Sequence, residues 1–256
     1  MSKIDLNSDI GESFGNYNLG MDQEVSKYIT SANIACGWHA GDPLVMEQTV
    51  KIAKENNVGI GAHPGFKDLM GFGRRKMDVS AQEVKAYIKY QLGALMAFAK
   101  SNNLKVSHLK PHGAMYNQAA SDYEIAEAIA EAIYEVDQDI ILMGLSGSQL
   151  IKAGKDKGVK VANEVFADRA YTPKGRLVSR KREGAVIHDP QKSVERMTQL
   201  IKKGYIEAIN GEKIELAADS ICVHGDNPEA LAQVEQLKEG LISAGVEITP
   251  LTKVIN

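Results

Sequence analysis

The feature that most constrains the fold is a recurring order of elements: a short apolar strand, a polar turn and an amphipathic helix. Helical segments with apolar residues at spacings of three and four follow most of the strands. This alternation is typical of parallel strands joined by helical crossovers. The expected strands span 4–9, 32–36, 58–62, 105–110, 140–145, 159–166, 220–224 and a short final segment at 246–249.

With about seven parallel strands, closure into an α/β barrel of the TIM type is favoured over an open sheet. The alternative is the open doubly wound sheet, but no G-x-G-x-x-G follows the first strand, which weakens its dinucleotide-binding form. No linker-like or low-complexity segment interrupts the 256 residues. We therefore expect one (β/α) barrel domain over residues 1–256.

Local signals predict several helix starts and one hairpin. Asp-Pro pairs at Asp42 and Asp189 supply a capping carboxylate followed by a proline at the first helical position. Ser80 with Glu83, and Ser121 with Glu124, have the spacing of a capping box. The pair Asn210-Gly211 predicts a small hairpin within 205–218.

Composition excludes some functions. The net charge of −3 gives no support for a nucleic-acid partner. No segment approaches the ~20 apolar residues that a membrane helix needs, so no membrane partner is expected. The polar start MSKIDLNSDIGE lacks the apolar core of a signal peptide, and a cytoplasmic location is the default expectation. Cys36 and Cys222 lie in apolar strands and are expected to be reduced, buried thiols.

Titratable side chains follow the strands at equivalent places. In a parallel barrel the carboxyl ends of all strands meet at one rim, so these side chains are expected to share an active site. Four of the six histidines are among them. The candidates are Asp9, Glu12, His39, Asp42, His63, Lys110, His112, Ser146, Ser148, Asp168, Arg169, His224 and Asp226.

Imidazoles and carboxylates can serve either as general acids and bases or as metal ligands. Asp9, His39 and His63 can form a three-ligand site for a divalent metal that keeps a position open for water. No tight H-x-x-x-H or H-E-x-x-H spacing is present, and the same side chains can bind substrate without a metal. His108 and His188 are assigned to structure.

The basic residues suggest anion binding. Lys110, before Pro111, can hold a carboxylate or a phosphate. Glu164 lies inside a strand, where a buried carboxylate needs a partner such as Arg169 or a lysine. Long loops over a barrel rim are often lids or partner surfaces. The alternative is that the arginines on these loops are ordinary solvated surface residues. The arginines on these loops are Arg74, Arg75, Arg176, Arg180 and Arg182.

Several long sequence segments that contain these candidate residues resemble the LamB/YcsF family. The match runs nearly from end to end, with mild departures at Trp38 and Met115. The strings are DLNSDIGE from Asp5, SANIACGWHAGDP from Ser31, GAHPG from Gly61, GFGRR from Gly71, HLKPHGAMYN from His108, EVFADRAYTPKGRLVSR from Glu164 and CVHGD from Cys222.

The resemblance implies a distorted TIM-like barrel of the glycoside hydrolase/deacetylase type. It implies an ATP-dependent 5-oxoprolinase, which opens 5-oxoproline to glutamate and uses ATP with Mg²⁺ as its counter-ion. It also implies two other subunits. The residues that it places in the cleft are Asp9, Glu12, His39, His63, Lys110, His112, Glu164, Asp168, Arg169, His224 and Asp226.

Two rival functions stay open at this point. A metal-dependent deacetylase or carbohydrate hydrolase on a similar barrel would bind zinc tightly and act without ATP. A non-catalytic subunit that only presents substrate would tolerate cleft substitutions. The convergence of acids and bases argues against the second rival.

Overall fold

The computed structural model describes residues 2–255, and its centre is a closed barrel of parallel strands. Neighbouring strands pair in chain order, and the last barrel strand pairs with the first, at Asn7 opposite Cys222. The barrel strands are β1 (Lys3–Ile10), β2 (Ser31–Ala35), β3 (Gly59–His63), β4 (Val106–Leu109), β5 (Ile141–Leu145), β6 (Val161–Phe166) and β9 (Ser220–Cys222). This confirms the predicted closed (β/α) barrel and its number of strands.

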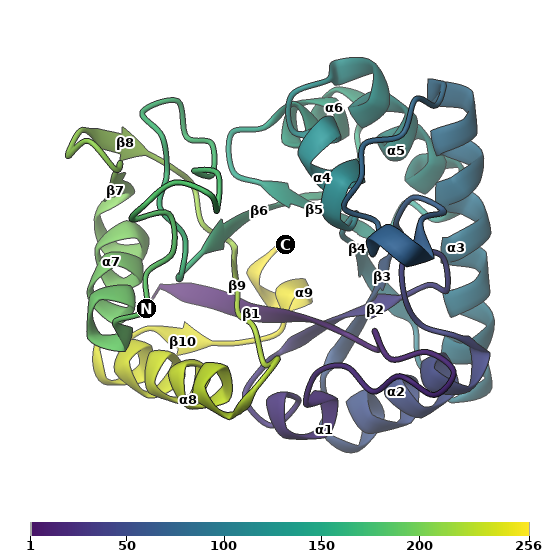
Figure 1. The fold of residues 1–256 in the computed structure, drawn as a ribbon, viewed down its shortest axis with the longest axis horizontal. Helices are drawn as coiled ribbons and strands as arrows, with labels where there is room; N and C mark the ends of the chain where they lie inside the picture. Colours follow the sequence, from purple (N-terminus) through teal and green to yellow (C-terminus); the bar gives the residue numbers. More distant parts are fainter. Residues whose placement is uncertain (1, 256) are drawn as a thin grey trace.

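The longer helices surround the barrel (Figure 1). They are α2 (Pro43–Glu55), α3 (Ala81–Ser101), α5 (Tyr123–Val136), α6 (Gln149–Lys157), α7 (Pro190–Lys203) and α8 (Pro228–Ser243). The shorter helical segments of residues 2–255 are α1 (Asp22–Val25), the 3₁₀ turn η1 (Leu69–Gly71), α4 (Gly113–Ala119) and α9 (Leu251–Val254). The largest apolar core cluster runs from Ile4 to Val246, which supports the proposal that the chain is one domain.

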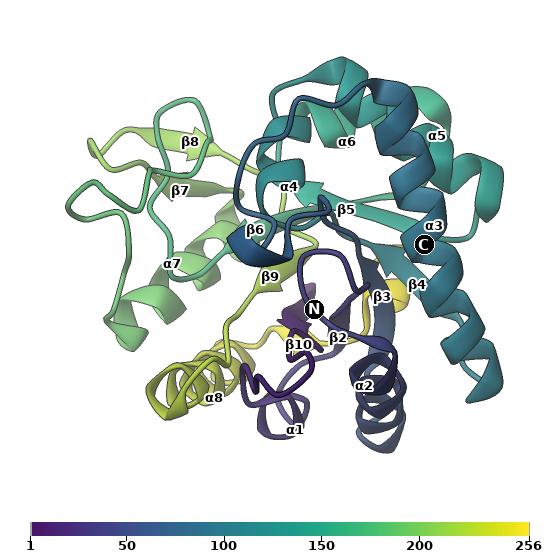
Figure 2. The ribbon, with the colours of Figure 1, turned by 45° about the vertical axis from the view of Figure 1, so that its right-hand side comes forward.

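The structure has three departures from a regular barrel. A long loop joins β6 to α7, and the hairpin of β7 (Tyr205–Glu207) and β8 (Lys213–Glu215) precedes β9. Figure 2 shows the loop and the hairpin on the α7 side of the barrel. The short β10 (Glu247–Ile248) pairs with the start of β1.

Helix α9 closes the end of the barrel at which the strands begin. Leu251 packs against Ile141, Met143 and Ala162, and Figure 1 shows α9 within the ring of strands. The opposite end, at the carboxyl ends of the strands, is therefore the one that is free to hold a site.

The barrel interior is polar along β1. Asp5 accepts hydrogen bonds from the hydroxyls of Thr30, Ser31 and Ser220 at 2.6, 2.7 and 2.5 Å. Burial raises the pKa of Asp5 to about 6, although these hydrogen bonds oppose the shift. The side chains of Asp5 and Asn7 on β1 are fully buried, so the polar face of this strand lines the inside of the barrel.

A glycine makes room for the structural histidine of β4. A Cβ on Gly61 would lie 2.2 Å from Nε2 of His108, and the β3–β4 register shifts between Ile60 and Gly61. His108 Nε2 contacts Oδ1 of Asn33 at 2.8 Å, and burial lowers its pKa to about 3. His108 thus holds Asn33, whose amide nitrogen donates to Asp9 at the rim.

Most predicted caps are present. Asp42 accepts from the backbone N–H groups of Leu44 and Val45, and Ser80 and Glu83 form a capping box. The capping box at Ser121 and Glu124 is wrong: the carboxylate of Asp122 caps α5, because it reaches the N–H groups of Glu124 and Ile125. Asp42 also accepts from the Gly15 N–H at 2.8 Å, which ties the loop after β1 to α2.

We predict that Asp42→Ala costs more stability than Asp189→Ala. Both lose a helix cap, worth about 1 kcal/mol, but only Asp42 also holds the loop at Gly15. Thermal and urea unfolding of the two variants measures the difference. Equal losses would show that the Gly15 contact contributes nothing.

Candidate active site

A cavity of about 480 Å³ opens at the carboxyl ends of the strands. Six predicted site residues line it: Asp9, His63, Lys110, His112, Arg169 and His224. Glu12, His39 and Glu164 contact these residues from behind. Asp168 and Asp226 line a neighbouring cavity of about 210 Å³, and the side chain of Asp226 is exposed.

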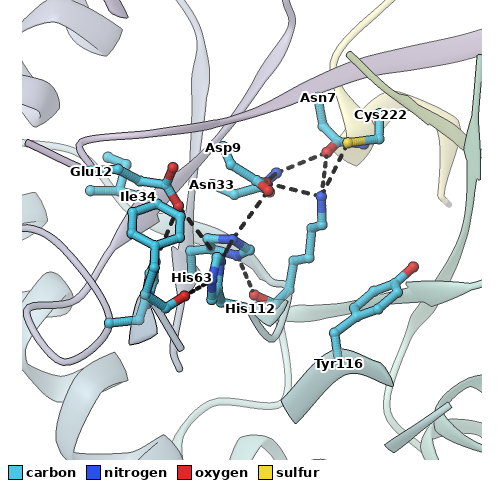
Figure 3. A network of polar contacts seen from close by, with 12 residues as sticks. Asn7, Asp9, Glu12, Asn33, Ile34, His63, His112, Tyr116 and Cys222 are labelled. Atoms are coloured by element: carbon cyan, nitrogen blue, oxygen red, sulfur yellow. Dashed lines mark hydrogen bonds and ion pairs between the residues drawn. The ribbon is translucent and has the colours of Figure 1, made fainter. Parts of the chain in front are cut away.

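Lys110 is the centre of a buried ion network, and Figure 3 labels three of its neighbours, Asn7, Asp9 and Cys222. Its Nζ lies 2.7 Å from Oε1 of Glu164 and 3.0 Å from Oδ1 of Asp9. It also donates to Oδ1 of Asn7 at 3.2 Å and lies 3.4 Å from Sγ of Cys222. Burial alone would lower the pKa of Lys110, but the attraction of Asp9 and Glu164 raises it well above its usual value. The ammonium group is therefore charged, and the carboxylates of Asp9 and Glu164 already balance its charge.

Glu164 has the buried partner that its position requires. The partner is Lys110, one of the two kinds of group expected, and not Arg169. Its other oxygen accepts from the hydroxyl of Tyr116 at 2.6 Å. Sequence reasoning missed Tyr116, although it stands one helical turn after His112 in the same string.

Asp9 joins this network to the histidines. Burial would raise its pKa, but His63 and Lys110 hold it well below its usual value. Its Oδ2 lies 3.3 Å from Nε2 of His63, and its Oδ1 accepts from the Asn33 amide at 2.8 Å. Sequence reasoning missed Asn33, whose signal is a lone polar residue at the centre of an apolar strand.

Three histidines and one carboxylate form a compact group beside Asp9, which we call the histidine group: Glu12, His39, His63 and His112. One ligand atom from each lies within 4.8 Å of all the others. The rings of His39 and His112 stack at 3.7 Å with planes 4° apart. Burial and neighbouring histidines lower the pKa of His39, and that of His112 to about 2, while burial and Asp9 raise that of Glu12.

This grouping differs from the predicted metal ligands Asp9, His39 and His63. His39 and His63 lie together, but Glu12 and His112 complete the set, and Asp9 stands outside it in contact with His63. The loop after β3 shapes the pocket, because a Cβ on Gly73 would lie 2.6 Å from His39 and 2.8 Å from His112. This loop therefore packs directly against both rings.

Three arginines line the cavity: Arg74, Arg169 and Arg180. The Arg74 guanidinium lies over the ring of Phe72, beside the histidine group, whereas Arg169 and Arg180 lie close to each other. Arg169 is mostly buried; its Nη2 donates to the Val178 carbonyl at 2.6 Å, and its buried Nε has no hydrogen-bond partner among the described residues. Burial and the nearby charge of Arg180 lower the pKa of Arg169. Guanidinium groups that repel one another across a cavity favour an anion between them.

His224 and Asp168 form a pair between the two cavities. Nδ1 of His224 lies 3.4 Å from Oδ2 of Asp168. Burial opposes charging of both groups, but the contact prevails: it raises the pKa of His224 and lowers that of Asp168. The ion pair therefore stabilises the fold above the usual aspartate pKa, and this contribution fades as the pH rises through the raised pKa of His224.

We predict that Asp168→Asn lowers the pKa of His224, because the favourable charge is removed and the desolvation remains. Titration of the histidine rings by NMR measures the shift, with the exposed His188 as internal reference. An unchanged His224 titration would contradict the pairing.

The fold and the site together define an α/β-barrel protein with an acid–base and histidine centre at the carboxyl ends of its strands. The model of the LamB/YcsF family matches residues 4–256, and the chain belongs to the LamB/YcsF family.

Named relatives agree with this assignment. The chain is 60% identical over 248 residues to the 5-oxoprolinase A subunit of Alkaliphilus metalliredigens (strain QYMF), covering 97% of each chain. It is similar to the solved lactam utilization protein of Thermus thermophilus, with 41% identity, a TM-score of 0.92 and coverage of 96% and 99%. A T48 deacetylase shares the fold, with 14% identity, a TM-score of 0.50 and coverage of 99% and 90%. The predicted deacetylase-type barrel is thus confirmed.

Two further predictions can be compared with the structure. Cys36 and Cys222 are free and buried, as expected. Within residues 2–255, none of the helices combines the length and the apolar composition needed to cross a bilayer.

Proposed function

We propose that this chain is part of an ATP-dependent 5-oxoprolinase, which opens the lactam ring of 5-oxoproline to give glutamate. The observation that carries the proposal is the 60% identity, over nearly the full length of both chains, to a protein named as the A subunit of 5-oxoprolinase. The cavity supports it, because acids, bases and arginines face a space suited to a small anion.

The reaction needs activation because a five-membered lactam is a stable amide. Transfer of the γ-phosphoryl group of ATP to the lactam oxygen releases ADP and leaves a phosphorylated imidate. Water then adds to the carbon, and the carbon–nitrogen bond breaks as the nitrogen gains a proton. A second water splits the acyl phosphate into glutamate and phosphate. We propose ATP, with Mg²⁺ as its counter-ion, as the co-substrate.

The arginines are the best candidates to hold the anionic groups. Lys110 is a poorer candidate than its position in the sequence indicates, since two carboxylates already compensate its charge. Within residues 2–255 the buried Nε of Arg169 has no hydrogen-bond partner, and Arg180 lines the same cavity. We assign them to the substrate carboxylate and the developing phosphate charge, and Lys110 to keeping Asp9 ionised.

The proton acceptor belongs to the opposite wall. Asp9 is ionised at neutral pH and touches His63, and both line the cavity. We propose that Asp9, or the histidine beside it, takes a proton from the lactam N–H or from water. Glu164 positions Lys110 from behind, and Tyr116, which also lines the cavity, holds Glu164.

Assembly and location complete the proposal. We propose that two other subunits join this chain, consistent with the relative's designation as one lettered subunit of its enzyme. A reaction that consumes ATP fits the cytoplasm.

A metal-dependent deacetylase is the second candidate function. The histidine group favours it, since histidine and carboxylate are the ligands of hydrolytic zinc. ATP-independent release of acetate from N-acetyl sugars would support it. A substrate-presenting role without catalysis is the third, and it predicts normal turnover when the cavity residues are replaced.

We predict that Asp9→Asn, Lys110→Ala and His112→Ala each lower glutamate formation by roughly 100-fold or more, because each removes a group from the acid–base wall. The assay uses the chain assembled with its partner subunits, with and without ATP. Asp78→Asn, at an exposed position, is the matched control. Near-normal turnover in all three variants would refute the active-site assignment.

We predict that Arg180→Ala raises the KM for 5-oxoproline by roughly 10- to 100-fold, as expected for loss of one charged hydrogen bond. Arg182→Ala is the control, because this exposed arginine of the same loop lines neither of these cavities. Equal KM values for the two variants would remove Arg180 from the anion site.

A further inference from the structure

The hydrogen bonds around His63 and His112 fix which ring nitrogens carry protons. Nδ1 of His63 lies 2.7 Å from the carbonyl oxygen of Lys110, and Nε2 of His112 lies 2.8 Å from the carbonyl oxygen of Phe72. A carbonyl oxygen can only accept, so both of these nitrogens carry hydrogen. In the neutral rings, the opposite nitrogens are therefore bare lone pairs.

Those two lone pairs face each other. Nε2 of His63 and Nδ1 of His112 are 3.0 Å apart. Oε1 of Glu12 lies 3.6 Å from Nδ1 of His112, and Oδ2 of Asp9 lies 3.3 Å from Nε2 of His63. Four acceptor atoms thus converge in a buried place, which is unfavourable unless a positive charge lies among them.

The separations suit a tetrahedral metal ion. Metal bonds of about 2.0–2.1 Å place neighbouring ligand atoms about 3.3 Å apart. The His63–His112 and Glu12–His112 separations are 3.0 and 3.6 Å, and Nε2 of His39 lies 3.2 Å from Oε1 of Glu12. Figure 3 shows Glu12, His63 and His112 pointing toward one another.

The groups that contact the far nitrogens of these two histidine rings are of the kind found around metal-binding histidines. Ligating histidines commonly donate their second ring N–H to a backbone carbonyl, which orients the ring. Phe72, whose carbonyl does this for His112, has a positive φ of 53°, a strained conformation for a large side chain. The loop therefore stores strain at the residue that orients the ring.

We propose that Glu12, His63 and His112 bind one divalent transition-metal cation, with Zn²⁺ as the best match, and that His39 holds the Glu12 carboxylate. His63 and His112 line the main cavity, so the ion would be reached from it and have an open position toward it. Imidazole-rich sites select zinc-like ions over Mg²⁺, which prefers oxygen ligands in octahedral geometry. The site follows from its geometry and does not rest on the proposed reaction.

Metal content of the full-length, tag-free chain tests the proposal. Metals are first removed with a chelator, and Zn²⁺ is then added. We expect elemental mass spectrometry to find one tightly bound zinc ion per chain, and we expect that excess Mg²⁺ does not displace it. Glu12→Gln and His112→Ala should lower zinc affinity by more than the roughly 10- to 100-fold that loss of an outer-shell partner costs. His188→Ala, an exposed histidine, should bind zinc normally. Wild-type protein that binds no zinc, or variants that bind it equally well, would overturn the site.

A second measurement covers the case in which a variant does not fold. In wild-type protein, nitrogen NMR of the histidine rings should show Nε2 of His63 and Nδ1 of His112 shifting when Zn²⁺ or Co²⁺ is added. His108, held by Ser107 and Asn33, should not shift. The proposal would be contradicted if the nitrogen signals of both rings did not change on addition of metal. It would also be contradicted if either ring were a doubly protonated imidazolium, which cannot bind a metal ion. Zinc binding without oxoprolinase activity would support this site and count against the proposed function.

Discussion

The buried ammonium of Lys110 is the interaction on which the rest of the site depends. A charge taken out of water is costly unless opposite charges and hydrogen bonds replace the lost solvent. Here Asp9 from β1 and Glu164 from β6 supply the charges, and Asn7 supplies a further acceptor. Strands on different sides of the barrel must therefore close correctly before the lysine is satisfied, and closure fixes Asp9 where it meets His63.

The two walls of the cavity have opposite electrostatic characters. On one side, Asp9 and the histidine group concentrate acceptor atoms, and on the other side Arg169 and Arg180 repel each other. The proposed anionic substrate with a reacting amide would fit this division, with its charge at Arg169 and Arg180 and its reacting bond at the acids and bases.

Most site residues could be predicted because strand ends in a parallel barrel converge whatever the details of packing. Asp9, His63, Lys110, His112, Arg169 and His224 all reached the main cavity by this rule. Asp226 did not, because the chain after β9 turns outward and leaves its side chain exposed. Tyr116, Asn33 and Arg180 were missed or left open, since their roles depend on contacts with elements distant in the sequence.

By itself, the sequence determined the order of strands and helices, most of the helix caps and the set of titratable groups at the strand ends. These follow from local periodicity and from backbone groups a few residues away. Only the tertiary structure decided that Glu12 and not Asp9 joins the histidines, and that nearby carboxylates already balance the charge of Lys110. It also decided that the carbonyl groups of Lys110 and Phe72 orient the rings. Such pairings depend on distances of about 3 Å between residues far apart in the chain, and no local pattern encodes them.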